Sequence, residues 1–224
     1  VKSLSKQDGR LSVEVNQAKT ISGAGILDAV IFSPDGKTVA SAFCDPVNED
    51  TTTCENESIV LWNAETYEQV GSYIPVANNI ANDKNVLLAY SPDGQTLAIA
   101  LDGATIFLLD MKSYQEKGPF QTQSGVTQMF FGPDGKTLLF ANGSDRNINF
   151  LDVNTLETKN VPVEGISKPI LSLAFSPDGK TIALGSADGT ILLWDAQTYK
   201  TLGQMLGRPT RVLSLAFSPD GKTL

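Results

Sequence analysis

The sequence predicts an all-β fold in which one small antiparallel sheet is repeated along the chain. Three observations predict it: the tripeptide Pro-Asp-Gly occurs five times, the apolar residues around it alternate with a period of two, and almost no stretch has helical periodicity. Of the 224 residues, 41% are hydrophobic and 19% are charged, close to the globular average. We therefore expect a folded chain with a sizeable core.

The Pro-Asp-Gly tripeptide is spaced almost regularly. Its copies begin at positions 34, 92, 133, 177 and 219, so the spacings are 58, 41, 44 and 42 residues. Serine precedes the tripeptide in four copies, and Gly132 takes its place in the third. Proline sets φ for the first corner of a turn, Asp suits the second, and Gly takes the left-handed position. Each copy is therefore predicted to be the turn of a β-hairpin.

Short apolar segments flank each turn and predict the strands. In the fourth copy, Ile170 to Phe175 precedes the turn and Thr181 to Leu184 follows it. A weaker segment, Thr198 to Leu202, is expected to be a fourth strand. Between them lies a third segment, present in every full copy: Ile59 to Trp62, Thr105 to Leu109, Ile148 to Leu151, and Thr190 to Trp194. Small four-stranded sheets cannot each bury a face alone, so they must stack, and a β-propeller of four-stranded antiparallel blades is the economical solution.

The chain has room for about five such blades and is predicted to be a single propeller domain, residues 1–224, or part of one. The expected blades are residues 27–80, 81–123, 124–167 and 168–209, with partial blades at 1–26 and 210–224. Two arrangements remain open. The N-terminus could supply the missing strands, through Gly9 to Val15 and Lys19 to Ser22, and close a five-bladed ring; or the chain is a segment of a longer propeller. The second is slightly favoured, because the last copy stops midway through its second strand.

Two segments carry a family resemblance: Leu-Leu-Trp-Asp at Leu192 to Asp195, and Val-Leu-Trp-Asn at Val60 to Asn63. Through them, residues from about 27 to the end resemble the WD-repeat propellers, and the phrase Phe-Ser-Pro-Asp-Gly-Lys-Thr is similar to the tandem repeats of bacterial members. The turn proline and the Trp position are separated by 17 residues in the second and fourth copies and 18 in the third. The resemblance implies a ring of blades that serves as a non-catalytic platform for a protein or peptide partner.

The chain departs from this family in one respect. Many members carry a Gly-His pair whose His joins a hydrogen-bond network with an Asp in a tight turn, and that pair is missing from every copy. Asp102 and Asp188 occupy the matching turns. We expect both to act as turn formers without that partner.

Composition excludes several classes of chemistry. The chain has no histidine, so Ser-His-Asp and Cys-His catalytic sets and imidazole zinc sites are impossible, and two cysteines cannot form a four-thiolate zinc site. The net charge of -8 disfavours nucleic acid, which needs clustered cations. No apolar stretch approaches the roughly 20 residues that cross a bilayer. We expect no catalytic residues, no cofactor and no resident metal.

The first predicted blade contains an insertion. Pro34 and Trp62 are 28 residues apart, against 17 in the fourth copy, so 11 extra residues lie between the second and third strands, and five more precede the next blade. Both are expected to be loops on the same rim. Cys44 and Cys54 flank the first one and are predicted to form a disulfide, which would place the protein outside the cytoplasm; without the bridge we expect a cytoplasmic protein. The oxygen-bearing side chains between and beside them leave calcium binding open, with a solvated loop favoured: Asp45, Asn48, Glu49, Asp50, Glu55 and Glu57.

The leading functional hypothesis is a protein-protein interaction platform that binds its partner on the loop-bearing rim. The candidate contacts lie in connections that lead into first strands, together with the insertion from Cys44 to Glu57: Asp83, Lys84, Lys168, Arg208 and Arg211. The alternative is a ligand-binding or enzyme-associated propeller of the periplasmic translocation or peptidase type, because such proteins also carry Ser-Pro-Asp-Gly turns.

Overall fold

The structure is a computed structural model that describes residues 4–7, 10–13, 26–46, 54–73, 86–101, 104–143, 146–206 and 210–224. This part of the chain consists of strands and turns, and it contains no helix that is long and apolar enough to cross a membrane. β1 (Leu4–Gln7) and β2 (Arg10–Val13) pair into a two-stranded antiparallel sheet of their own. The remaining strands form four sheets of four strands, each antiparallel and in sequence order.

These sheets are the blades that the sequence predicts. Blade 1 consists of β3 (Ile26–Phe32), β4 (Thr38–Pro46), β5 (Cys54–Asn63) and β6 (Gln69–Tyr73). Blade 2 consists of β7 (Leu87–Tyr90), β8 (Thr96–Leu101), β9 (Thr105–Asp110) and β10 (Glu116–Gln121). Blade 3 consists of β11 (Val126–Phe131), β12 (Thr137–Asn142), β13 (Asn147–Asp152) and β14 (Thr158–Pro162). Blade 4 consists of β15 (Ile170–Phe175), β16 (Thr181–Ser186), β17 (Thr190–Asp195) and β18 (Thr201–Leu206).

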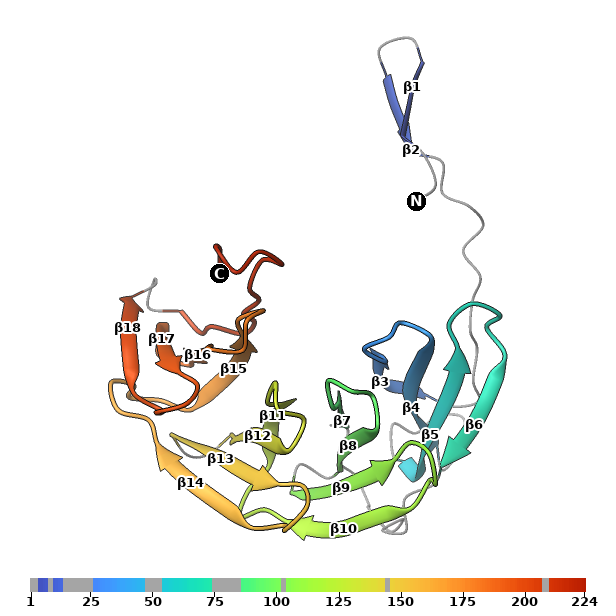
Figure 1. Cartoon of the computed structure of the whole chain (residues 1–224), viewed down its shortest axis with the longest axis horizontal. Helices are drawn as coiled ribbons and strands as arrows, with labels where there is room; N and C mark the ends of the chain where they lie inside the picture. The colour runs from blue at the N-terminus through green and yellow to red at the C-terminus, as the bar shows by residue number, and fades with distance from the viewer. Residues whose placement is uncertain are drawn as a thin grey trace.

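The four blades follow one another in an arc, with their first strands on its inner side (Figure 1). The first strands of neighbouring blades contact each other, β3 with β7, β7 with β11, and β11 with β15. The described sheets do not close into a ring. The arrangement confirms the predicted propeller of four-stranded antiparallel blades.

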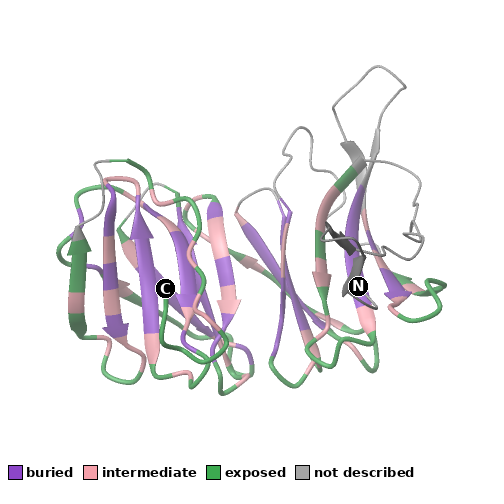
Figure 2. Ribbon diagram, turned by 90° about the horizontal axis from the view of Figure 1, so that it is seen from above, coloured by how far each residue is buried: buried purple, intermediate pink, exposed green. Residues whose placement is uncertain are grey.

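Neighbouring blades pack together because each sheet buries side chains on both of its faces. Successive side chains along a strand point to opposite faces. In β12, Leu138 and Phe140 pack against blade 2, whereas Leu139 and Ala141 pack against blade 4. All four side chains are almost fully buried. Figure 2 shows buried positions running along many strands, with exposed positions at the turns and along fourth strands such as β10 and β14.

The Pro-Asp-Gly turns are held by a repeated set of hydrogen bonds. In the first, Oγ of Ser33 donates to Oδ1 of Asp35 (2.7 Å), which also accepts from the Lys37 amide (3.0 Å), while the Thr38 amide donates to Ser33 Oγ (3.0 Å). Gly36 follows with a φ of 69°, a value that suits glycine. The same bonds recur at Ser91, Ser176 and Ser218.

The third turn has no serine and is held by different side-chain hydrogen bonds. Because residue 132 is glycine, the carboxylate of Asp134 bonds forward instead, accepting from the amide of Thr137 (3.1 Å) and from its Oγ1 (3.0 Å). The turn therefore keeps its shape with a different side-chain pairing.

Two strand predictions need correction. The fourth strand of blade 4 begins at Thr201, not Thr198, because Oδ1 of Asp195 accepts hydrogen bonds from Gln197 and Thr198 and holds a turn there. The partial blade expected at 210–224 would begin with a first strand at Leu213 to Phe217, which repeats the alternation of β15, but no described segment pairs with it as a ladder. This segment instead lies against blade 4, where the Val212 amide donates to the Ser186 carbonyl oxygen (3.1 Å).

The insertion of blade 1 is also less irregular than predicted. β4 and β5 are nine and ten residues long, and their ladder continues to the pair Pro46–Cys54, so part of the insertion extends the hairpin. A continued ladder satisfies backbone groups that an irregular loop would leave to water. Cys44 pairs with Glu57 in this register. The two cysteine side chains lie outside the described residues, as do the acidic side chains of the insertion, so the disulfide, the compartment and calcium binding stay predictions.

Candidate functional site

Antiparallel pairing divides the connections of the propeller between two faces. The turns from first to second strand and from third to fourth strand lie at one end of each blade, which we call the turn face. The connections from second to third strand and between blades lie at the other end, which we call the loop face. Two of the predicted partner contacts, Lys168 and Arg211, lie in described connections of the loop face. Lys168 and Arg211 are described and exposed, whereas Asp83, Lys84 and Arg208 lie outside the described residues.

On the loop face, Asp188 links two successive connections. Its Oδ2 accepts from both the amide (2.6 Å) and Oγ (2.7 Å) of Ser167, and its Oδ1 accepts from the Thr190 amide (2.9 Å). Burial alone would raise the pKa of Asp188, but these donors outweigh it and hold the pKa well below its ordinary value. Asp188 therefore does more than form a turn: it also accepts from Ser167, which takes the donor role that histidine has in many family members. Asp102 lies outside the described residues.

The connection before β15 is fixed at a second point. The guanidinium of Arg146 donates to the carbonyl oxygen of Ile166 (3.2 Å), and the Val163 amide donates to the Arg146 carbonyl oxygen (2.8 Å). Ile166 and Val163 are buried in the core between blades 3 and 4. These residues border an open cavity of about 590 Å³ at the loop face. Sequence reasoning missed it, because Arg146 and Ile166 are 20 residues apart.

Ser186 positions both described candidate cations. Its Oγ donates to the carbonyl oxygen of Lys168 (3.0 Å), and its own carbonyl oxygen accepts from the amide of Val212, the residue after Arg211. Ser186 is fully buried, so the two connections are attached to one rigid point of blade 4. The backbones of Lys168 and Arg211 are thus held by blade 4 while their side chains remain exposed.

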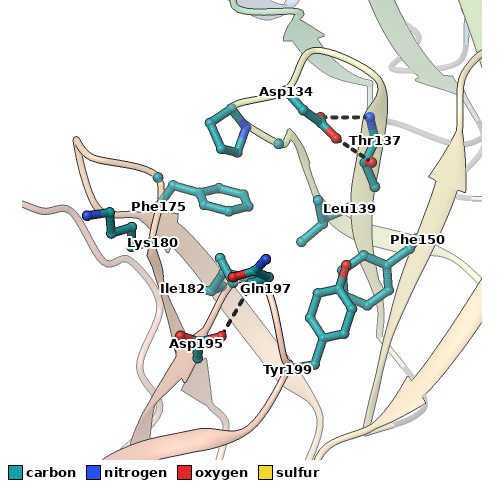
Figure 3. A pocket seen from close by; sticks show the side chains of 14 residues that line it. Asp134, Thr137, Leu139, Phe150, Phe175, Lys180, Ile182, Asp195, Gln197 and Tyr199 are labelled. Carbon is teal, nitrogen blue, oxygen red and sulfur yellow. Dashed lines mark hydrogen bonds between the residues drawn. The ribbon is translucent and has the colours of Figure 1, made fainter.

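The turn face contains pockets between neighbouring blades. The blade 3–4 pocket has a volume of about 450 Å³. Figure 3 shows Leu139 and Phe175 pointing toward each other across it, with Phe150 and Tyr199 side by side on another wall. The rings of Phe150 and Tyr199 are 4.4 Å apart, and Nζ of Lys159 lies 5.0 Å from the centre of the Tyr199 ring.

A second pocket occupies the equivalent place one boundary away. The blade 1–2 pocket also has a volume of about 450 Å³, and Tyr90 and Tyr114 stand where the blade 3–4 pocket has Phe175 and Tyr199. The sequence signal for these pockets is a tyrosine four residues after the residue that ends the third strand, as Tyr114 follows Asp110 and Tyr199 follows Asp195. Both tyrosines have positive φ, 54° and 56°. In the described part of the chain, no three acidic or cysteine side chains group as they would to hold a metal ion.

Comparison with known families shows which proteins the chain is related to. A model of the WD domain, G-beta repeat, matches residues 159–195, which run from β14 through the Trp-Asp end of β17. Proteins described as WD repeat-containing match over longer stretches. The chain belongs to the WD-repeat family.

Similar proteins come from distant organisms. The WD-repeat chain is 29% identical to the serine-threonine kinase receptor-associated protein of Gallus gallus over 77% of its own length and 43% of that protein. It is 32% identical to an uncharacterized WD repeat-containing protein of Synechocystis, over 72% of its length and 42% of that protein. It is 33% identical to WD repeat-containing protein 82 of Drosophila melanogaster, over 50% and 38%. The chain thus spans less than half the length of each of these relatives.

A solved structure supports the fold. The β-propeller domain of Myceliophteria thermophila Cps50 (Swd1) superimposes with a TM-score of 0.72, over 90% of this chain and 62% of that domain. The sequence identity is 16%, so this likeness shows the fold alone.

Proposed function

We propose that this WD-repeat chain is a non-catalytic platform that binds a protein or peptide partner on its loop face. The observation that carries the proposal is that one buried residue, Ser186, bonds to the backbone of Lys168 and to that of Val212, the residue after Arg211. A surface whose backbone is fixed before binding loses little conformational entropy on association, which favours recognition. Lys168 and Arg211 are exposed cations on a chain whose net charge is -8, so their side chains suit an acidic partner segment.

Relatives support the same class of function. WD-repeat proteins bind proteins, and one printed name describes association with a receptor, the serine-threonine kinase receptor-associated protein. The absence of histidine from the whole sequence supports a non-catalytic role, because the common nucleophile-base pairs need an imidazole. The acidic net charge supports a protein partner over nucleic acid.

Charge reversal on the loop face tests the proposal. The chain, immobilised, would be compared with a K168E/R211E variant for retention of proteins from an extract of cells that express it. A K200E/K222E variant provides the control, because Lys200 and Lys222 are exposed, belong to the turn face and give the same change in net charge. We expect the amount of partner retained by the loop-face variant to fall at least about tenfold, since charge reversal at an interface weakens binding and slows association. Equal loss in both variants, or no loss in either, would overturn the proposal.

A further inference from the structure

The two turn-face pockets occupy equivalent positions but differ in charge. Counting from the residue that ends each third strand, Lys159 of blade 3 corresponds to Val70 of blade 1, seven residues on in both cases. By the same repeat, Lys180 corresponds to Gln95. Lys180 lines the blade 3–4 pocket and Lys159 lies at the ring of Tyr199, another lining residue, whereas the corresponding positions of blades 2 and 1 are an amide and a valine.

In the blade 3–4 pocket the chain itself supplies a cation to the tyrosine. Lys159 Nζ lies 5.0 Å from the centre of the Tyr199 ring, within the range of a cation–π interaction. Tyr114 is the equivalent tyrosine of the blade 1–2 pocket, and its hydroxyl lies near Gly71 of β6. Among the described residues no Lys or Arg lies over the Tyr114 ring, which is 45% exposed. A cation from outside could therefore occupy the place that Lys159 has at the other boundary.

The blade 1–2 pocket also carries negative charge that is not neutralised inside it. Asp35 and Asp93 line it, and none of its lining residues is Lys or Arg. Each carboxylate uses Oδ1 in its own turn, and within the described residues Oδ2 accepts no hydrogen bond. The serine hydroxyl in each turn, followed by the backbone amide two residues on, keeps the pKa of both carboxyls below its ordinary value, so both are charged at neutral pH.

A buried hydroxyl without a partner adds an independent indication of a ligand. Tyr90 lines the same pocket, is only 9% exposed, and its hydroxyl makes no hydrogen bond. A buried polar atom with no partner is costly, and such an atom in a pocket is an acceptor or donor that a ligand can satisfy. Burial, with smaller effects of Tyr114 and Asp35, raises the pKa of Tyr90 to about 12, so the hydroxyl stays neutral. Phe175 has no hydroxyl at the equivalent place.

We propose that the blade 1–2 pocket binds a basic side chain of a protein partner, an arginine in preference to a lysine. A guanidinium can stack on the exposed ring of Tyr114 while it donates to the free carboxylate oxygens of Asp35 and Asp93, and Tyr90, whose buried hydroxyl has no partner, lines the same pocket. The site is on the turn face, so it is separate from the loop-face site and does not depend on it.

Binding is tested with N-acetyl-arginine amide against N-acetyl-citrulline amide, which has nearly the same shape but no charge. Backbone amide NMR signals of the whole chain report where each compound binds. We expect the arginine compound to shift the signals of Gly94, Gln95 and Tyr114 with a Kd of roughly 1–10 mM, as suits one side chain held by exposed charges. The equivalent signals of Gly179, Lys180 and Tyr199 should stay unchanged.

Variants assign the effect to named atoms. D35N/D93N should weaken binding at least about fivefold, because asparagine keeps the turn-forming oxygen and removes the charge. Y90F should weaken it about threefold without unfolding the chain, since phenylalanine already fits at position 175. D134N in the blade 3–4 pocket is the matched control and should change nothing.

Three results would overturn the proposal. The first is no shift at about 50 mM arginine compound, a concentration well above the expected Kd. The others are equal shifts with the citrulline compound and equal shifts in both pockets. Shifts of the same signals that grow with protein concentration alone would identify a second copy of the chain as the occupant, and would also overturn it.

A gain-of-function variant gives a second test. F175Y/K159V/K180Q removes the two lysines and adds the hydroxyl at the equivalent place, and the arginine compound should then shift the signals of Gly179 and Tyr199 too.

Discussion

The indole Nε1 of Trp62 donates a hydrogen bond of 2.6 Å to Oγ of Ser41, and that hydroxyl donates in turn to the Val60 carbonyl oxygen at 3.2 Å. Both residues are buried, and Trp62 also packs edge-on against Phe43. The chain thus satisfies the polar atom of a buried tryptophan through the neighbouring strand of its own blade. Trp194 is the equivalent residue of blade 4, but there Leu184 stands at the position that Ser41 has in blade 1. The Trp194 indole nitrogen has no partner among the described residues.

Replacing Ser41 by alanine should lower the free energy of unfolding by about 1–3 kcal/mol, because the Trp62 nitrogen would be buried without an acceptor. Urea unfolding of the two proteins measures the difference. In a W62F background the same S41A change should cost clearly less, because no donor is then left unpaired. An equal cost in both backgrounds would mean that the hydroxyl acts through packing and not through Trp62.

The repeat made most of the fold predictable, because its turn chemistry is local. Ser33, Asp35 and Gly36 hold a hairpin through contacts within a few residues, and alternation along Leu171 to Phe175 assigns the strands. The start of β18 was misplaced because the hydrogen bonds from Gln197 and Thr198 to Asp195 define a turn that apolar periodicity does not reveal.

The candidate site was less predictable, because its contacts join distant residues. Ser167 and Asp188 are 21 positions apart and meet only when successive connections fold onto one blade. Lys168 and Arg211 were anticipated from their place before first strands, but their common attachment to Ser186 was not. The turn-face pockets depend on side chains from two blades, so the packing of the blades had to be known first.

Replacing Gly132 by serine should stabilise the chain by roughly 0.5–1.5 kcal/mol, because the new hydroxyl could make the two bonds seen in the other turns and glycine would no longer add conformational freedom to the unfolded chain. The added Cβ would lie 3.2 Å from Oδ1 of Asp134, a flexible side chain that can turn away from it. Thermal unfolding of G132S and G132A separates the two effects. If alanine stabilises as much as serine, the hydroxyl contributes nothing.

Asp188 should make stability depend on acid. Its folded-state pKa is depressed, so the folded chain binds fewer protons than the unfolded one, and the stabilisation is present above the ordinary value of 3.8 and is lost as pH falls below it. Urea unfolding between about pH 5 and pH 2, which covers the onset and much of that loss, should therefore show a steeper decline for the natural chain than for D188N. Other aspartates in the turns also have lowered pKa values, so both proteins lose stability in acid, and only the difference between them reports on Asp188.

Alanine at position 185 should detach the segment that carries Arg211 from blade 4. A Cβ on Gly185 would collide with Oγ of Ser172, which donates to the Val212 carbonyl oxygen, and would lie 2.6 Å from Cγ1 of Val212, so the contacts that hold this segment must shift. Its bond to the Ser186 carbonyl oxygen would then be lost, and hydrogen exchange of the Val212 amide should become at least about tenfold faster. G203A is the control, because nothing lies within 4 Å of that position. Unchanged exchange in G185A would contradict the attachment on which the loop-face proposal rests, whereas faster exchange together with weaker partner retention would connect the position of Arg211 to binding.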